Sequence, residues 1–342
     1  MKVLEIIPLE PLSLTLSPIS GIDIFTVTHS TPIPLPTSIA GALGSSMNVV
    51  LSSNDPMGSL IELISRLKEL CGNTEEPIVQ GPLTCFEEWI TDPSKCYAYI
   101  HGNRLLSLSF SGIEVRKKMV YLREECKDHV DCIVDFSPIT MIGVSLQRTK
   151  PGEDKNVRYG YMYRYPLVIF RTSSRGVVNP IYVYRFNCRK DLNLINRFGG
   201  ESRVAKFVTR NVEADFLNNI KTPLKKLERG LYISLSPIPM IPLKDNILRL
   251  ESNAVEIPIP LFSVMGVPQE KSQPKIRVVR LGLGFSEVVR KRRPEILALP
   301  PGTVIRVEND VNPPTFSGDD LMKELLYIGF ATLYKLSDRI EN

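Results

Sequence analysis

Several features that would place this sequence in a specialised protein class are scarce or missing. No apolar run in its 342 residues reaches the roughly 18 residues that span a membrane, so we expect no transmembrane segment. The first residues, Met1 to Pro11, alternate as a strand does and lack a charged start before an apolar core, so we expect no secretion signal. Glutamine occurs only four times. Depletion of thermolabile amides is a feature of thermophile proteins.

Cysteine is also sparse, and its spacing matches no familiar framework. Six cysteines without a CxxC pair are too few for a disulfide scaffold in a chain of this length, so a cytoplasmic location fits best. In a hyperthermophile, intracellular disulfides would again be allowed. Cys126, His129 and Cys132 are residue types that bind zinc, but the spacing is not that of a finger and no fourth ligand is evident. We therefore expect no metal site here. The cluster is explained instead by a solvated helix or loop, or by a Cys126–Cys132 disulfide.

Motifs for catalysis are missing as well. Gly282-Leu283-Gly284 does not match the phosphate-binding loop of nucleotide hydrolases. None of the three histidines lies in a nucleophile–histidine–acid motif. We therefore expect neither a nucleotide-hydrolysing loop nor a catalytic triad, and no cofactor. The alternative is a ribonuclease in which His29 acts as acid or base, against a structural or backbone-contacting role for the same histidine.

Charge is unevenly distributed along the chain. Residues 141–229 contain 18 Lys and Arg against 7 Asp and Glu, whereas residues 1–140 contain 10 against 17. A concentrated basic region is typical of proteins that bind the phosphate backbone of nucleic acids. The alternative is an arginine-rich solvated surface. The acidic first part argues against a protein that coats nucleic acid on all sides.

Hydrophobic periodicity predicts many strands and few helices, which favours an α+β fold. An amphipathic helix is expected over 59–70, capped by Ser59 and ended by Gly72, with partly helical stretches over 114–132 and 213–227. Tyr97–Ile100 and Leu105–Phe110 should form a hairpin. Further strands are expected at 3–9, 78–83, 141–147, 159–170, 181–186, 204–208, 230–235, 276–281 and 304–308.

The segment from Thr28 to Gly44 is the most informative one. Prolines at 32, 34 and 36 favour an extended lead-in, and Thr37 or Ser38 can cap the helix that follows. Ala40, Gly41, Ala42 and Gly44 leave that helix nearly bare. The free N–H groups at its start can receive a phosphate, or the helix can simply pack tightly on a sheet.

A second candidate lies between 148 and 165. A polar loop that contains Arg148, Lys150 and Arg158 precedes tyrosines at alternating positions of a strand. Cations beside aromatic rings suit single-stranded nucleic acid, in which bases stack on such rings. The alternative is a hairpin whose tyrosines face the core and whose loop charges are solvated.

Two glycine turns lie beside arginine. Gly199-Gly200 precedes Arg203, and consecutive glycines permit close approach of the backbone to a phosphate or ribose. This turn can also be a plain tight turn. The second pairs Gly282 and Gly284 with a run of four cations, Arg290, Lys291, Arg292 and Arg293.

Together these motifs resemble the RAMP superfamily of CRISPR proteins, in particular the third subunits of type III-B Cmr effector complexes. That family has a P-x-P-[ST]-[ST]-I-x-G-A-L-like signature after its first strand, then a Gly-Pro strand, a basic loop followed by G-x-[LM]-Y, a GGE-x-R turn and a late P-x-G-[ST]-V. The matches are collinear and span residues 8 to 304. They are Pro8 to Pro11, Pro34 to Leu43, Gln80 to Leu83, Arg148 with Gly160 to Tyr163, Gly199 to Arg203, Arg293-Pro294, and Pro300 to Val304.

The resemblance implies two ferredoxin-like (RRM-type) domains with long insertions, which we place at 1–165 and 166–342, with a β-hairpin thumb at about 141–165. It implies a non-catalytic, cytoplasmic subunit that grips the 5′ handle of the guide RNA, with the target RNA nearby. The partners would be the large polymerase-like subunit and the backbone RAMP subunit, with no membrane. The expected RNA-binding residues are His29, Ser30, Thr37, Ser38, Gly41, Arg148, Lys150, Arg158, Gly199, Gly200, Arg203, Arg290, Lys291, Arg292 and Arg293.

Overall fold

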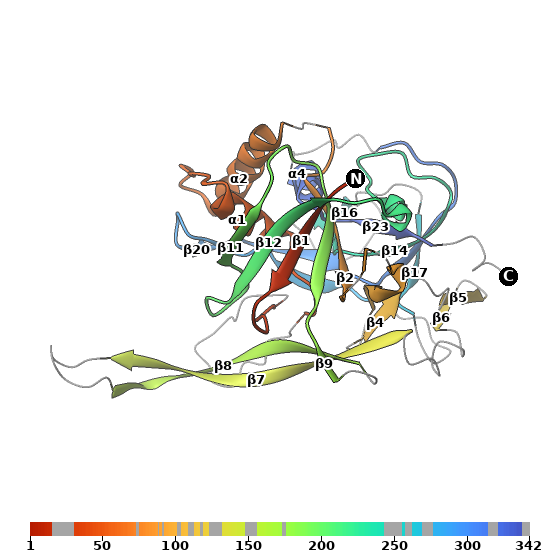
Figure 1. Cartoon of the computed structure of the whole chain (residues 1–342). Coiled ribbons are helices and arrows are strands. Elements are labelled where there is room, and N and C mark those ends of the chain that lie inside the picture. Colours follow the sequence, from red (N-terminus) through yellow and green to blue (C-terminus); the bar gives the residue numbers. More distant parts are fainter. Residues whose placement is uncertain are drawn as a thin grey trace.

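The computed structural model describes most of the chain, and we restrict the account to that part. It comprises residues 1–15, 31–72, 75–87, 89–90, 92–100, 104–108, 113–116, 119–122, 132–147, 156–172, 176–242, 255–256, 262–268, 276–313 and 321–336. Strands dominate, and every strand pairing among these residues is antiparallel (Figure 1). The fold is thus mixed α and β with few helices, in agreement with the α+β expectation.

A ten-stranded sheet forms the larger part of the molecule. Its order is β11-β12-β1-β10-β2-β3-β4-β7-β8-β9, so strands from distant parts of the sequence alternate. The bounds are β1 Lys2–Pro8, β2 Val79–Cys85, β3 Cys96–Ile100, β4 Arg104–Ser107, β7 Ile133–Gln147, β8 Asn156–Thr172, β9 Gly176–Val178, β10 Ile181–Phe186, β11 Asn193–Arg197 and β12 Val204–Asn211. Because β1 pairs with both β10 and β12, this sheet continues past residue 165, the expected domain boundary, which falls inside β8.

The remaining strands form smaller sheets. A five-stranded sheet has the order β13-β23-β14-β22-β17, and a four-stranded sheet has the order β16-β15-β21-β18. The hairpins β5-β6 and β19-β20 each form a separate two-stranded sheet. The bounds are β5 Ile113–Arg116, β6 Met119–Leu122, β13 Ile220–Lys221, β14 Gly230–Ser234, β15 Ile238–Pro242, β16 Val255–Glu256, β17 Phe262–Gly266, β18 Val279–Gly282, β19 Phe285–Ser286, β20 Lys291–Arg292, β21 Glu295–Leu299, β22 Val304–Val307 and β23 Leu333–Lys335.

The helices and the second sheet cover opposite faces of the central strands. Helices α1 (Pro36–Ser46) and α2 (Pro56–Cys71) pack on the face that carries Leu4 and Phe207, with Leu43 buried between them. On the opposite face, Val3 packs in a cluster with Ile233 of β14. Helix α4 (Leu321–Tyr327) and the 3-10 turns η1 (Pro93–Lys95) and η2 (Asp215–Asn219) are the remaining regular elements in the described part of the chain. Among the described residues, no helix is long and apolar enough to cross a membrane.

Both helix starts differ from the expectation. The first helix begins at Pro36 after Leu35, without a side-chain cap, because proline already fixes the backbone angle at the first helical position; Thr37 and Ser38 lie inside the first turn. The second begins at Pro56, three residues before the expected cap Ser59, and the Asp55 side chain accepts the N–H of Gly58. Its end at Gly72, in the left-handed conformation, confirms the expected stop.

Two expected helical stretches differ from the structure where it describes them. The first part of 114–132 contains the β5-β6 hairpin, in which β-branched residues pair across the strands, as Val115 does with Val120. Residues 123–131 of this stretch lie outside the described residues. Over 213–227 the regular structure is limited to η2 and β13, since Pro223 cannot continue a helix. The other expected strands in the described residues are present with shifted ends, and 181–186 has the bounds of β10.

The chain contains disulfides, although its few cysteines argue against a disulfide scaffold. Cys71 at the end of α2 is bonded to Cys188, which lies 117 residues further along the chain. Cys85 and Cys96 are bonded across β2 and β3, where they are register partners. Cys132 is disulfide-bonded as well. A link across so long a loop stabilises the folded state by restricting the unfolded chain.

Candidate nucleic-acid interface

Three of the segments that the sequence marks as RNA-binding meet at one short stretch of backbone. Consecutive carbonyl groups of Leu12–Leu14, which we call the junction segment, each accept a different backbone N–H. Leu12 accepts from Val168 at the base of the β7-β8 hairpin at 3.0 Å, and Ser13 accepts from Gly200 at 2.8 Å. Leu14 accepts from Thr31 at 3.0 Å, and Thr31 directly follows His29 and Ser30 in the sequence. The fold thus brings together segments more than 100 residues apart.

The turn from Gly199 to Arg203, called here the glycine turn, joins β11 to β12 and touches the junction segment. Gly199 has φ of 84°, and a Cβ there would lie 3.0 Å from the Ser13 carbonyl oxygen. Glu201 and Ser202 also have positive φ. Such angles cost non-glycine residues free energy, so the surrounding contacts must hold this turn in place. Glycine is therefore favoured at 199 by its positive φ and by the nearby Ser13 carbonyl.

Arg203 is held by an ion pair and does not extend freely into solvent. Its guanidinium pairs with the Glu10 carboxylate, and Nη2 donates to the Tyr165 hydroxyl at 3.4 Å. Partial burial disfavours the charged guanidinium, but the bonds to Glu10 and Tyr165 outweigh it and raise the pKa of Arg203. Arg203 therefore fastens the glycine turn to the end of β1 and to the long hairpin.

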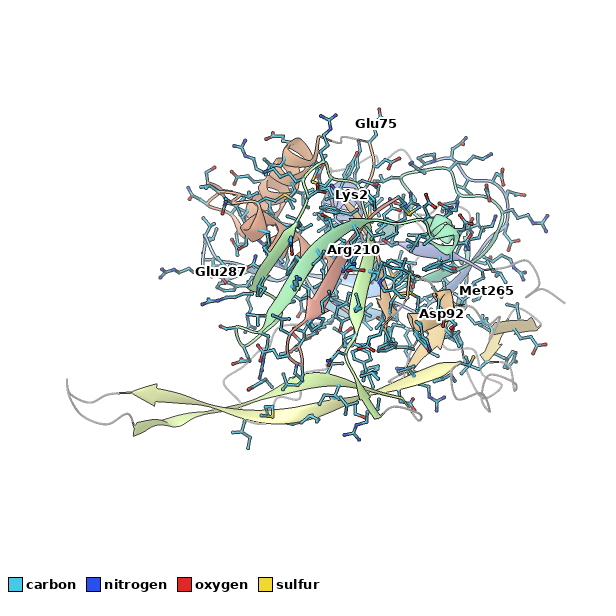
Figure 2. All side chains as sticks on the ribbon, viewed as in Figure 1. Lys2, Glu75, Asp92, Arg210, Met265 and Glu287 are labelled. Carbon is cyan, nitrogen blue, oxygen red and sulfur yellow. A yellow bond between two sulfur atoms is a disulfide. The ribbon has the colours of Figure 1, made fainter. Side chains whose placement is uncertain are left out.

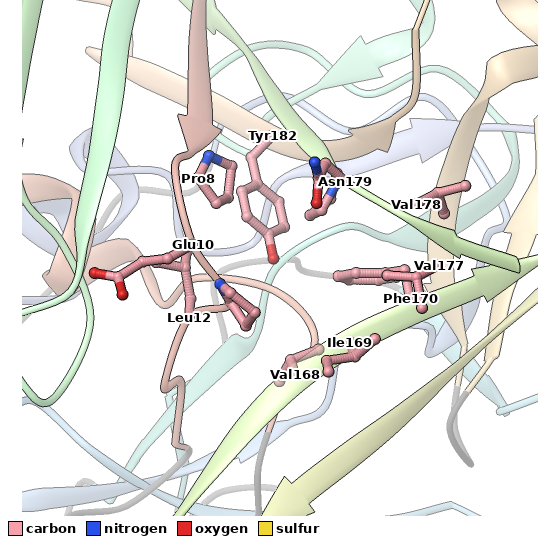
Figure 3. Close-up of a pocket in the computed structure, with 12 residues that line it drawn as sticks. Pro8, Glu10, Leu12, Val168, Ile169, Phe170, Val177, Val178, Asn179 and Tyr182 are labelled. Atoms are coloured by element: carbon pink, nitrogen blue, oxygen red, sulfur yellow. The ribbon is translucent and has the colours of Figure 1, made fainter.

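A small hollow lies beside this ion pair, between the end of β1 and the base of β8 (Figure 3). Its walls are mainly apolar, with Leu12, Val168 and Phe170 among them, and Tyr182 donates its hydroxyl to the Pro32 carbonyl at 2.9 Å. The one carboxylate among its lining residues is that of Glu10, and it points away from Phe170 in Figure 3. An apolar hollow with an acidic side chain does not suit phosphate.

Strands β7 and β8 form a long two-stranded arm that extends along the bottom of Figure 1. Its register runs from Asp135 opposite Arg171 to Gln147 opposite Asn156. Arg158 lies in β8 near the free end. Arg148 and Lys150, like His29 and Ser30, lie outside the described residues.

The helix start is only partly open. Thr37 is buried, whereas Ser38 and Gly41 are exposed one turn apart, and a Cβ on Gly41 would meet nothing within 4 Å. On the opposite side, a Cβ on Gly44 would lie 2.5 Å from a methyl carbon of Leu63 in α2. The small residues therefore serve tight helix packing on one side and leave an open surface on the other.

The second glycine–arginine constellation is the hairpin β19-β20 with its flanks, residues 284–293, called here the basic hairpin. Arg290, Lys291 and Arg292 are exposed, and within the described part of the chain none of them has an ion pair. Arg293 differs, since it donates to the carbonyls of Pro56 at 3.1 Å and Phe285 at 3.0 Å. Burial lowers the pKa of this guanidinium. Its hydrogen bonds link the basic hairpin to the start of α2.

Sequence reasoning missed Glu10, Ser13 and Tyr165 as members of this region. Glu10 carries no local signal, because its cation Arg203 lies 193 residues further along the chain. Tyr165 belongs to the alternating tyrosines of the predicted strand, and its contact with Arg203 is likewise not local. As for metal, Cys132 is bonded to sulfur, Cys126 and His129 lie outside the described residues, and the described residues contain no cluster of three metal-ligating side chains.

Comparison with known proteins adds to this geometry. No known family model and no curated protein matches the sequence. Among solved structures, one chain of a cryo-electron microscopy structure of type III-B Cmr-beta bound to cognate target RNA matches with a TM-score of 0.57 at 20% identity. A chain of the same complex bound to target RNA and AMPPnP gives a TM-score of 0.61 at 20% identity. Each match covers 97% of this chain and 96% of the other.

This protein has the fold of a Cmr-beta chain. The match extends over nearly the whole of both chains, so it includes the ten-stranded sheet as well as the smaller sheets. The fold is in keeping with the family that the sequence motifs indicate.

Proposed function

We propose that this chain is a non-catalytic, RNA-binding subunit of a type III-B CRISPR effector complex, and that it grips the 5′ handle of the guide RNA. The observation that carries the proposal is the junction segment, where the hairpin base, the glycine turn and the segment after His29 and Ser30 meet. The sequence motifs predict RNA binding for the glycine turn, for the segment of the β7-β8 hairpin and for the segment with His29 and Ser30, each from its own residues. Their convergence in a chain with the Cmr-beta fold supports a single RNA-binding region.

The strand orders support two ferredoxin-like units. In that fold, four strands connected as β-α-β-β-α-β lie in the order 4-1-3-2. The strands β1, β2, β10 and β12 have this order with α1 and α2 in the first crossover, and β14, β17, β22 and β23 have it with α4 in the second. We accordingly place the boundary between the units after β12, and β7-β8 is the thumb that projects from the first unit.

The location and partners follow from the same proposal. Disulfides persist in oxidising compartments and inside hyperthermophiles. Together with the scarcity of glutamine, the disulfides at Cys71 and Cys85 support a cytoplasmic protein of a thermophile. The large polymerase-like subunit and the backbone RAMP subunit are the proposed protein partners, and the guide brings target RNA close.

The test is binding of the purified chain to a guide RNA that carries its repeat-derived 5′ handle, measured by fluorescence anisotropy against the same RNA with a scrambled handle. We expect tighter binding of the intact handle and a salt-dependent affinity. The double variant Arg148→Ala with Lys150→Ala should bind both RNAs more weakly. Equal affinity for the two RNAs would contradict handle recognition.

The same samples separate a scaffold from a nuclease. We expect the RNA to remain intact during incubation with the chain. Cleavage of repeat RNA that His29→Ala abolishes would instead establish the ribonuclease with His29 as acid or base.

A further inference from the structure

The strongest unassigned feature is the open face of β11 and β12. Their register places Ile195 opposite Lys206 and Arg197 opposite Val204, and side chains alternate between faces along each strand. The opposite face carries Phe207, buried under α1, and Asn196, whose Nδ2 donates to the Ala42 carbonyl at 3.3 Å. The residues that face away from α1 are Asn193, Ile195 and Arg197 of β11 and Val204, Lys206, Val208 and Arg210 of β12; we call them the open strip.

The same sheet face is covered elsewhere. Over β1 and β10, Val3 and Val183 are fully buried in the cluster that includes β14 and β22. That cover ends at β1, so on β11 the Ile195 side chain is 61% exposed, and Arg197 and Lys206 are exposed. Figure 2 shows Arg210 among these strands, at the border between the covered and the open part.

Charge on the open strip has one sign. Three of its seven residues are cations and none is an acid. Arg210 Nε lies 2.9 Å from the buried Glu5 carboxylate, but its side chain remains 52% exposed. Arg197 and Lys206 form no ion pair with any described residue. Uncompensated cations in a row attract a polyanion.

The strip also continues from the proposed interface. The glycine turn is the tip of the β11-β12 hairpin, so an RNA strand held at the junction segment has the strip directly beyond it. Lys206 and Arg210 are about 13 Å apart along their strand at ~3.3 Å per residue, with Arg197 beside them on the next strand. The strip therefore offers separate cations along the direction of β12.

We infer that the open strip binds the sugar-phosphate backbone of single-stranded RNA, as an extension of the proposed handle site. This inference rests on the proposed function. Lys206 and Arg197 contact phosphate, and the strip reads no base sequence. Contacts of this kind weaken with salt and are independent of sequence.

The experiment uses the full chain and two probes, the handle-bearing guide RNA and a labelled uridine homopolymer about 20 nucleotides long. In the double variant Arg197→Ala with Lys206→Ala, we expect roughly tenfold weaker binding of both probes and a salt slope shallower by about 1.4. The matched control is Arg229→Ala with Lys323→Ala, which removes two exposed cations of the second unit and should leave both affinities unchanged. Circular dichroism melting checks that each variant is folded.

The outcomes separate the strip from the proposed function. Wild-type preference for the intact handle together with unchanged binding by the strip variant overturns the strip alone. An equal loss of affinity in the control variant also overturns the strip, since total positive charge and not the position of the cations would then determine RNA binding. A wild-type chain that binds neither probe overturns both proposals. If the strip variant binds RNA normally but no longer joins its protein partners, the strip is a protein-docking surface and the inference is wrong.

Discussion

The glycine turn and the basic hairpin both set arginine beside glycine, yet they use the charge in different ways. In the glycine turn, Arg203 is paired with Glu10 and bonded to Tyr165. In the basic hairpin, Arg290 and Arg292 extend from the surface without an ion pair among the described residues, and the neighbouring Arg293 is half-buried against α2. A run of cations in a sequence thus contains structural and solvent-facing members that the sequence alone does not separate.

The largest effect on stability is expected for Arg203→Ala. Its loss leaves the Glu10 carboxylate partly buried without its cation, so the free energy of unfolding should fall by about 2 kcal/mol. Urea unfolding followed by the fluorescence of Trp89, the single tryptophan and a buried one, measures this. A double-mutant cycle with Glu10→Gln is the control. Additive effects of the two substitutions would mean that the ion pair does not stabilise the fold.

A smaller loss is expected for Arg293→Ala, which removes donors from the carbonyls of Pro56 and Phe285. We expect a decrease of about 1.5 kcal/mol in the free energy of unfolding. Its neighbour Arg292, which is exposed, is the matched control and should change stability by less than about 0.5 kcal/mol when replaced by alanine. Equal decreases in the free energy of unfolding for the two variants would show that Arg293 contributes no more to stability than the exposed Arg292.

Two glycine substitutions compare a backbone position with positive φ and a close neighbour to an open position in a helix. Gly199→Ala should lower the free energy of unfolding by about 1 kcal/mol, because φ is positive and the Ser13 carbonyl is close. Gly41→Ala should raise it by about 0.5 kcal/mol, since alanine is the better helix former and the site is open. If RNA packs against the bare helix, Gly41→Ala also weakens RNA binding although the protein is more stable. Thermal melting and anisotropy on one sample distinguish the two effects.

Local sequence patterns predicted the elements whose signal lies within a few neighbouring residues, and they did not predict contacts between distant residues. A nearly continuous apolar and aromatic run predicted β10, and Gly72 predicted the end of α2, because each signal is contained in a few neighbouring residues. The helix start at Pro36 was missed because Thr37 and Ser38, the two candidate caps, follow it directly. The burial of Arg293 depends on Pro56, 237 residues away, and such a contact leaves no local trace. The same holds for the meeting of Gly200 with Ser13.

The smallest effect on stability is expected for the triple variant Arg290→Ala, Lys291→Ala and Arg292→Ala, because these three cations are exposed and have no ion pair among the described residues. Its free energy of unfolding should stay within about 0.5 kcal/mol of the wild type. If these cations neutralise phosphates, the slope of log affinity against log salt for single-stranded RNA becomes shallower by about 2. Arg203→Lys, which keeps the charge but loses the planar fork, should alter stability and leave that slope unchanged. A triple variant with the wild-type slope would show that the basic hairpin faces something other than RNA, and the contrast between the two glycine–arginine constellations would then concern folding alone.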